Sequence, residues 1–200
     1  MLKKLGLISI ATASAFAMNS AEININDKDL EATLSIDLGQ VNKNVEPDTT
    51  FISFRALKGS DDHSTDKNAD IKSFYEVNFL MIREFKTTGF KIGMGVKANY
   101  TGNANDDVFV TIPLGLETRY TIPAEVPVTI GANIYYAPES LSLADANSFT
   151  EYRAFVNAEI IENASVVVGY RAIYTEYKVN GVKADLNLNK YGYFGFKFNF

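Results

Sequence analysis

The chain has 200 residues, a formal net charge of -5 and no cysteine. The length corresponds to about one domain, and the lack of cysteine excludes a disulfide framework, a thiolate zinc site and a cysteine nucleophile. The acidic balance argues against a protein that binds the nucleic-acid backbone, because such proteins carry a basic surface. With 46% hydrophobic residues the chain is too apolar for disorder, and its mean hydropathy of -0.05 resembles that of a soluble protein.

The first predicted element is a secretory signal peptide at residues 1–17. Lys3 and Lys4 precede an apolar stretch that ends in Ala15-Phe16-Ala17, which fits the cleavage rule of such peptides. We expect cleavage after Ala17, with Ala21 as the alternative. The stretch is too short for a membrane-spanning helix, and no later run reaches the ~18 apolar residues that one requires. Residues 18–29 are expected to form a lead-in to the folded domain.

The rest of the chain alternates between apolar and polar residues with a period of two, which predicts strands almost throughout. Most segments are longer than the five or six residues usual in soluble sheets, and approach the ~9–11 that a tilted strand needs to cross a bilayer. The predicted strands are Leu30–Gln40, Phe51–Gly59, Ser73–Phe85, Gly89–Thr101, Val108–Thr121, Val126–Pro138, Glu151–Ile161, Ser165–Lys178 and Lys190–Phe200.

The spacers between these strands also alternate. Short spacers at 86–88, 122–125 and 162–164 take turns with long polar ones at 60–72, 102–107, 139–150 and 179–189. Short turns on one rim and long loops on the other are typical of an outer-membrane barrel.

One face of the predicted strands is apolar, and the opposite face collects charges. From Phe90 to Tyr174, and again from Gly192 to Phe200, the apolar face carries no charge. A lone buried charge is costly, so a narrow barrel with both signs inside would neutralise them in a network that fills its lumen. The charged face holds seven acids and seven bases: Glu31, Asp37, Glu76, Glu84, Glu117, Glu151 and Glu159, with Arg55, Lys91, Lys97, Arg119, Arg153, Arg171 and Lys197.

Alternation alone fits a soluble lipocalin-like barrel as well as a membrane barrel. Strand length favours the membrane barrel, and so do tyrosines near the segment ends, because Tyr gathers at membrane–water interfaces. The last strand ends in Phe196, Phe198 and Phe200, the aromatic terminus expected to deliver the chain to the barrel assembly machinery. The tyrosines are Tyr100, Tyr120, Tyr136, Tyr152 and Tyr174.

Four segments carry a family resemblance: Tyr135–Leu141, Glu151–Ala154, Gly169–Arg171 and the aromatic-Gly-Phe-x-Phe-x-Phe end of the chain. They resemble the YfaZ family of Gram-negative outer-membrane proteins, and the acidic loop Ser60–His63 is similar to an early loop of that family. The resemblance is firmest over residues 110–200. It implies a small outer-membrane β-barrel and carries over no catalytic residue.

We therefore expect an all-β, antiparallel up-and-down transmembrane barrel over residues 30–200. Counted back from a periplasmic carboxyl terminus, Phe51–Phe200 supplies eight strands, which is the favoured number. Leu30–Gln40 would be a ninth strand, but bacterial barrels have even strand numbers. Ten strands result if Ile23–Asp27 pairs beside it as a short extra strand.

The expected function is a structural or surface-interaction role for a barrel with a charge-plugged lumen. A narrow porin-like channel for small solutes or ions is the alternative, and a lipid-modifying enzyme is a remote one. His63 is the only histidine, and its neighbours Ser60, Asp61 and Asp62 are residues that also build ordinary polar loops, so we expect no catalysis. We expect no cofactor, metal or nucleic acid, and a monomer that contacts outer-membrane lipids including lipopolysaccharide.

Overall fold

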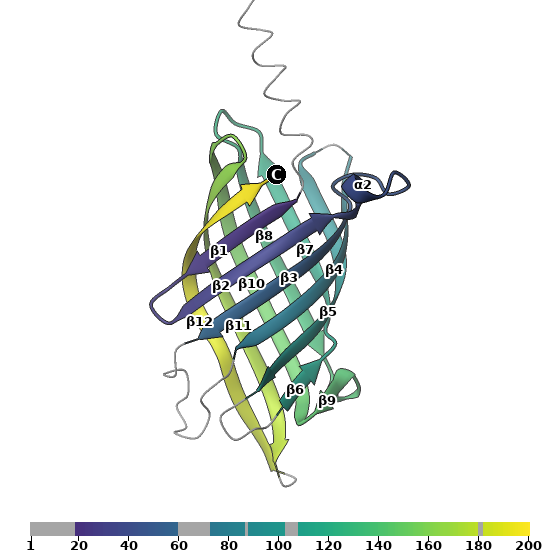
Figure 1. Ribbon diagram of the computed structural model, residues 1–200, viewed down its shortest axis with the longest axis vertical. Coiled ribbons are helices and arrows are strands. Elements are labelled where there is room, and N and C mark those ends of the chain that lie inside the picture. The colour runs from purple at the N-terminus through teal and green to yellow at the C-terminus, as the bar shows by residue number, and fades with distance from the viewer. Residues whose placement is uncertain (1–18, 60–72, 87, 103–107, 180–181) are drawn as a thin grey trace, which may run out of the picture.

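The computed structural model is a closed antiparallel β-barrel (Figure 1). It describes residues 19–59, 73–86, 88–102, 108–179 and 182–200, so the predicted signal peptide and the loop with His63 lie outside the described residues. The elements in chain order are β1 Ser20–Ile25, β2 Asp29–Asp37, α2 Leu38–Val41, β3 Thr50–Gly59, β4 Phe74–Glu84, β5 Phe90–Gly102, β6 Val108–Thr111, β7 Leu114–Ile122, β8 Val128–Ala137, η1 Glu139–Leu141, β9 Ser142–Ala144, β10 Ala146–Ile161, β11 Ala164–Val179 and β12 Val182–Asn199.

The wall of the barrel is a single ring of strands. The order is β4-β3-β2-β1-β12-β11-β10-β8-β7-β5, and the pairing of β4 with β5 closes it. β6 and β7 share one position against β5, because Pro113 between them has no N–H to give to the ladder. β9 pairs with β6 and adds no strand to the ring. The described wall therefore has ten strands, and the predicted fold class is confirmed.

The favoured count of eight strands is wrong, because the segment before Leu30 is part of the wall. β1 pairs with both β2 and β12, so that Ser20 lies opposite Ser35 on one side and Asn199 on the other. Without β1 the edges of β2 and β12 would remain unpaired, which a barrel in lipid avoids. The ten-strand alternative is correct, and residues 18–29, expected as a lead-in, contribute this strand.

Two spacers predicted as long loops are largely strand. β10 begins at Ala146 rather than Glu151, and β12 begins at Val182 rather than Lys190. The β11–β12 hairpin projects beyond the rest of the wall (bottom of Figure 1), where a strand has no need of an apolar face. The polar composition of 179–189 therefore resembles a loop, although most of its described residues are paired.

The strand predicted at Leu30–Gln40 ends early. The carboxylate of Asp37 accepts the Gly39 N–H at 2.9 Å and caps the short helix α2, which stops β2 at Asp37. Among the described residues no helix is long and apolar enough to cross a membrane.

The two ends of the barrel differ in their connections (Figure 1). The turn end, at the top of the view, carries α2, the short turns between β7 and β8 and between β10 and β11, and the terminal Phe200. At this end the Phe200 N–H donates to the Asn19 carbonyl at 2.9 Å. The loop end, at the bottom, carries η1 and β9.

Apolar side chains point outward from the wall, and charged side chains point inward. On β5 Met94 is 71% exposed, whereas Lys97 is 3% exposed. On β8 Ile134 is 54% exposed, and its neighbour Tyr135 is fully buried. This orientation is the reverse of a soluble lipocalin-like barrel, the alternative that alternation alone leaves open.

Glycines make room for aromatic side chains inside the barrel. Tyr135 and Phe155 lie directly across the sheet from Gly115 and Gly131. A Cβ atom added to Gly131 would lie 2.3 Å from the Phe155 ring, and one added to Gly115 would lie 2.4 Å from that of Tyr135. A Cβ atom added to Gly95 would lie 2.2 Å from the hydroxyl oxygen of Tyr135. The glycines therefore let large rings lie flat against the inner wall, where they position the charged groups beside them.

Candidate functional site

The centre of the lumen is an ion-pair network around Arg55 on β3. Its guanidinium donates to both oxygens of Glu151 on β10, at 2.5 and 2.9 Å, and to Glu76 on β4 at 2.5 Å. The bond to Glu151 crosses the barrel, because β3 and β10 are not neighbours in the wall. Arg55 and Glu76 are 5% and 7% exposed, and Glu151 is fully buried. The network therefore ties opposite walls together through side chains that are almost fully buried.

Lys97 on β5 completes this central group. Its ammonium lies 2.6 Å from Glu151 and 3.1 Å from Glu76, so two acids share two bases. The same ammonium lies 3.9 Å from the centre of the Tyr135 ring, a cation–π contact that is strong when it is desolvated. Every charge of the group has an opposite partner, as buried charges require.

A second group surrounds Glu31 on β2, which is fully buried. Arg171 on β11 donates to this carboxylate, Arg153 on β10 lies 3.1 Å from it, and Asn24 donates to it at 2.8 Å. Arg55 lies 3.6 Å away and joins the two groups into one network.

A third, smaller group forms on β7 and β8. Glu117 accepts from the Tyr135 hydroxyl at 2.7 Å and pairs with Arg119 at 3.3 Å. Asn78 donates to the same carboxylate at 3.4 Å. Because Tyr135 also contacts Lys97, this group borders the central one.

Of the fourteen predicted lumen charges, nine belong to these three groups, and the other five do not. Asp37 caps α2 outside the network. Glu84 and Glu159 accept backbone N–H groups in turns, from Gly89 at 2.8 Å and Asn163 at 3.2 Å. Lys91 pairs with Asp48 near the turn end, and Lys197 forms no ion pair with another described residue. The nine are Glu31, Arg55, Glu76, Lys97, Glu117, Arg119, Glu151, Arg153 and Arg171.

Sequence reasoning missed several partners of this network. Glu22 pairs with Arg153 at 2.9 Å, and Asn24 bridges Glu22 and Glu31. Both residues lie on β1, where Glu22 and Asn24 alternate with Ala21, Ile23 and Ile25, and that short alternation was the available signal. Tyr193, which accepts from Arg153, carries no charge and gives no sign of its role in the sequence.

An apolar cluster lies inside the barrel on the loop-end side of the network. The Phe74 ring stacks on that of Phe149, with their centres 6.2 Å apart, and it also faces the Arg55 guanidinium at 5.2 Å. All of the clustered side chains are at most 8% exposed. This apolar cap consists of Leu57, Phe74, Phe109, Ala137, Ala146, Phe149, Ile173 and Leu188.

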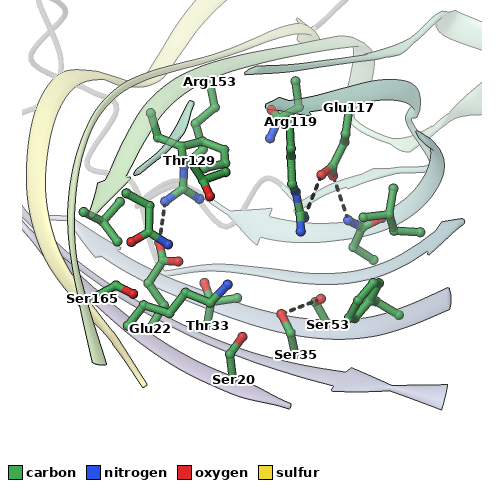
Figure 2. A pocket seen from close by; sticks show the side chains of 18 of the residues that line it. Ser20, Glu22, Thr33, Ser35, Ser53, Glu117, Arg119, Thr129, Arg153 and Ser165 are labelled. Carbon is green, nitrogen blue, oxygen red and sulfur yellow. Dashed lines mark hydrogen bonds and ion pairs between the residues drawn. The ribbon is translucent and has the colours of Figure 1, made fainter. Parts of the chain in front are cut away.

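The turn-end half of the lumen contains a polar cavity of about 400 Å³, here called the vestibule (Figure 2). Arg55, Glu76 and Lys97 of the network line its inner part, and Asp48 and Asn199 line it near the turn end. The lumen is thus divided along its length into a vestibule, a charged network and an apolar cap. Among the described residues no group of three or more His, Cys, Asp or Glu could hold a metal ion.

A closed antiparallel barrel with an apolar outside and a charged inside has the architecture of transmembrane β-barrels. The family model described as YfaZ precursor matches residues 2–200, so the chain belongs to the YfaZ family. The resemblance found in the sequence is thereby confirmed and extends over essentially the whole chain. No curated protein matches the chain significantly.

Proposed function

We propose that this protein is a small barrel of the bacterial outer membrane, exported by its signal peptide, with the turn end in the periplasm. The outward apolar side chains support this placement, since they would be costly to expose to water. The word precursor in the family description supports an exported chain.

The lumen of this barrel is closed, and its role is structural or one of surface interaction rather than transport. The observation that carries the proposal is the Arg55–Glu151 bond across the lumen, joined to Glu76 and Lys97 on other strands. Groups that are this buried and this fully paired leave no continuous water path between the walls. The apolar cap then adds a second, uncharged barrier on the loop-end side.

Conductance of the refolded protein in a planar lipid bilayer tests the closed lumen. The wild type should show no stable conductance steps, whereas steps of general-porin size in the wild type would contradict the proposal. Arg55→Met combined with Phe74→Ala and Phe149→Ala breaks the network and thins the apolar cap, and this variant should produce openings. Phe79→Ala is the matched control, because Phe79 lies on the same strand but points outward, 40% exposed, and it should stay silent.

A narrow channel is the second candidate, and the vestibule favours it. A polar cavity of about 400 Å³ already occupies part of the lumen, so small ions would need only the network and the apolar cap to open. Small but steady ion-selective steps in the wild type would favour this channel over the closed barrel.

The remaining roles in the proposal concern partners and catalysis. The barrel is a monomer that contacts outer-membrane lipids, including lipopolysaccharide, and it performs no catalysis. Its assembly depends on the last strand, where Phe196, Phe198 and Phe200 are 46%, 54% and 61% exposed and project from the wall. Unchanged lipid A and phospholipid profiles in a deletion strain are the expected result for a protein without lipid-modifying activity.

A further inference from the structure

The geometry points to the vestibule as a binding site for a small organic anion. Such a ligand has a carboxylate or phosphate group and, on its neighbouring carbon atoms, hydroxyl groups. The cavity of about 400 Å³ falls within the ~300–1,000 Å³ typical of small-molecule sites. It is lined by residues of many strands, so its shape is fixed by the barrel wall rather than by loops.

Besides Arg55, Lys97 and Arg153 of the first two groups, three further bases line the vestibule. Lys91 on β5 and Arg119 on β7 lie directly opposite each other across one strand pair. Lys197 enters from β12, which is separated from β5 and β7 by other strands in both directions around the wall. Bases gathered in a walled cavity raise the local concentration of anions.

The protein neutralises these bases only in part. Lys91 pairs with Asp48, and Arg119 pairs with Glu117 at 3.3 Å. Lys197 has no ion-pair partner in the part of the chain that the structure describes, because Glu22, opposite it on β1, pairs with Arg153 instead. The Lys197 ammonium thus remains to bind an oxyanion.

The wall facing Arg119 offers hydroxyl groups (Figure 2). Ser35 and Ser53 lie side by side with their oxygens 2.8 Å apart, and Ser20 also lines the cavity. A hydroxyl group both donates and accepts, so this wall matches the hydroxyl groups of a ligand. Five acids also line the cavity, but four of them pair with its bases and Glu159 accepts the Asn163 N–H, so Lys197 makes an anion the preferred ligand.

The site rests on the closed lumen of the proposed function, because Arg55, Glu76 and Lys97 line its inner part. In the proposed orientation the ligand would enter from the periplasm. Binding itself does not depend on the orientation, so it can be measured with protein refolded in detergent micelles.

Calorimetric titration with D-gluconate, glycerol 3-phosphate and acetate tests the site. At least one of the two hydroxyl-bearing anions should bind, and more tightly than acetate, which lacks hydroxyl groups. Lys197→Gln should weaken that binding about tenfold or more, because it removes a charge-assisted hydrogen bond. Lys190→Gln removes the same charge from an exposed position on the same strand and should leave the affinity unchanged.

Three results would overturn the site. The first is that neither hydroxyl-bearing anion binds at concentrations up to about 10 mM, near the weak limit of specific recognition. The others are that acetate binds as tightly as each hydroxyl-bearing anion, or that Lys197→Gln and the wild type bind with equal affinity. Conductance measured on the same preparation separates this outcome from failure of the closed lumen. A silent barrel that does not bind refutes only the site, and a conducting barrel that binds refutes only the closed lumen.

Discussion

Substitution of Arg55 by Met is the sharpest perturbation of the lumen network. It removes the partner of three carboxylates and leaves Glu76 and Glu151 with Lys97 alone. Removing one member of a buried ion pair costs about 3–5 kcal/mol, because the other charge remains buried without its partner. The side chains of Arg55 and Glu151 are 4% and 0% exposed, so little water reaches the Glu151 carboxylate to replace the lost contact. We expect the variant to lose at least about 3 kcal/mol of unfolding free energy.

The matched control is Arg83→Met. Arg83 pairs with Glu46 in water, with side-chain exposures of 61% and 70%, and such pairs are worth at most about 1 kcal/mol. Urea titration of the refolded protein, with the folded fraction read from mobility on SDS gels without heating, measures both losses. Adding Glu151→Gln to Arg55→Met should recover part of the loss, because it removes the carboxylate left unpaired. Equal costs for Arg55→Met and Arg83→Met, or additive losses in the double variant, would refute the reasoning.

Three further changes test the barrel. Gly131→Ala should destabilise the barrel by about 1–3 kcal/mol in urea titration, because the new Cβ would lie 2.3 Å from Phe155. Gly192→Ala is the control and should cost less, because the atom nearest to a Cβ at Gly192 is 3.7 Å away. Deletion of residues 18–28, which removes β1, should abolish the heat-modifiable shift on SDS gels; a deletion variant that still shows the shift would contradict the ten-strand wall. Phe200→Ala should lower the amount assembled in the outer membrane of cells but not refolding in detergent, and equal losses in both would argue against recognition by the assembly machinery.

Much of the fold could be predicted because its physical causes are local. The alternation of Phe90, Ile92, Met94 and Val96 with Lys91 and Lys97 is a property of one strand, and the structure places those two sets on opposite faces. β1 was harder to assign, because a strand of six residues has few alternations and gains its stability from β2 and β12, which are distant in sequence.

The pairing of charges could not be predicted, because it depends on which strands face each other across the lumen. Arg55 and Glu151 are 96 residues apart and meet only after the ring closes. By their positions along the strands, Asp37, Glu84 and Glu159 belong to the same inward-facing set as the network residues. They lie at strand ends, however, and accept hydrogen bonds from backbone N–H groups there. The alternation along a strand therefore predicts which face a side chain occupies, whereas its position along the barrel axis can be known only from the structure.

Fluorescence quenching by lipids brominated on their acyl chains tests most directly whether this barrel lies in a membrane with its charges inside. The chain contains no Trp, so a single substitution gives an unambiguous signal. Met94→Trp places the reporter on the outward face, where Met94 is 71% exposed, and Phe155→Trp places it in the lumen beside the vestibule. After refolding into vesicles, Met94→Trp should be strongly quenched and Phe155→Trp only weakly. Equal quenching of the two, or stronger quenching of Phe155→Trp, would contradict an apolar face in contact with lipid.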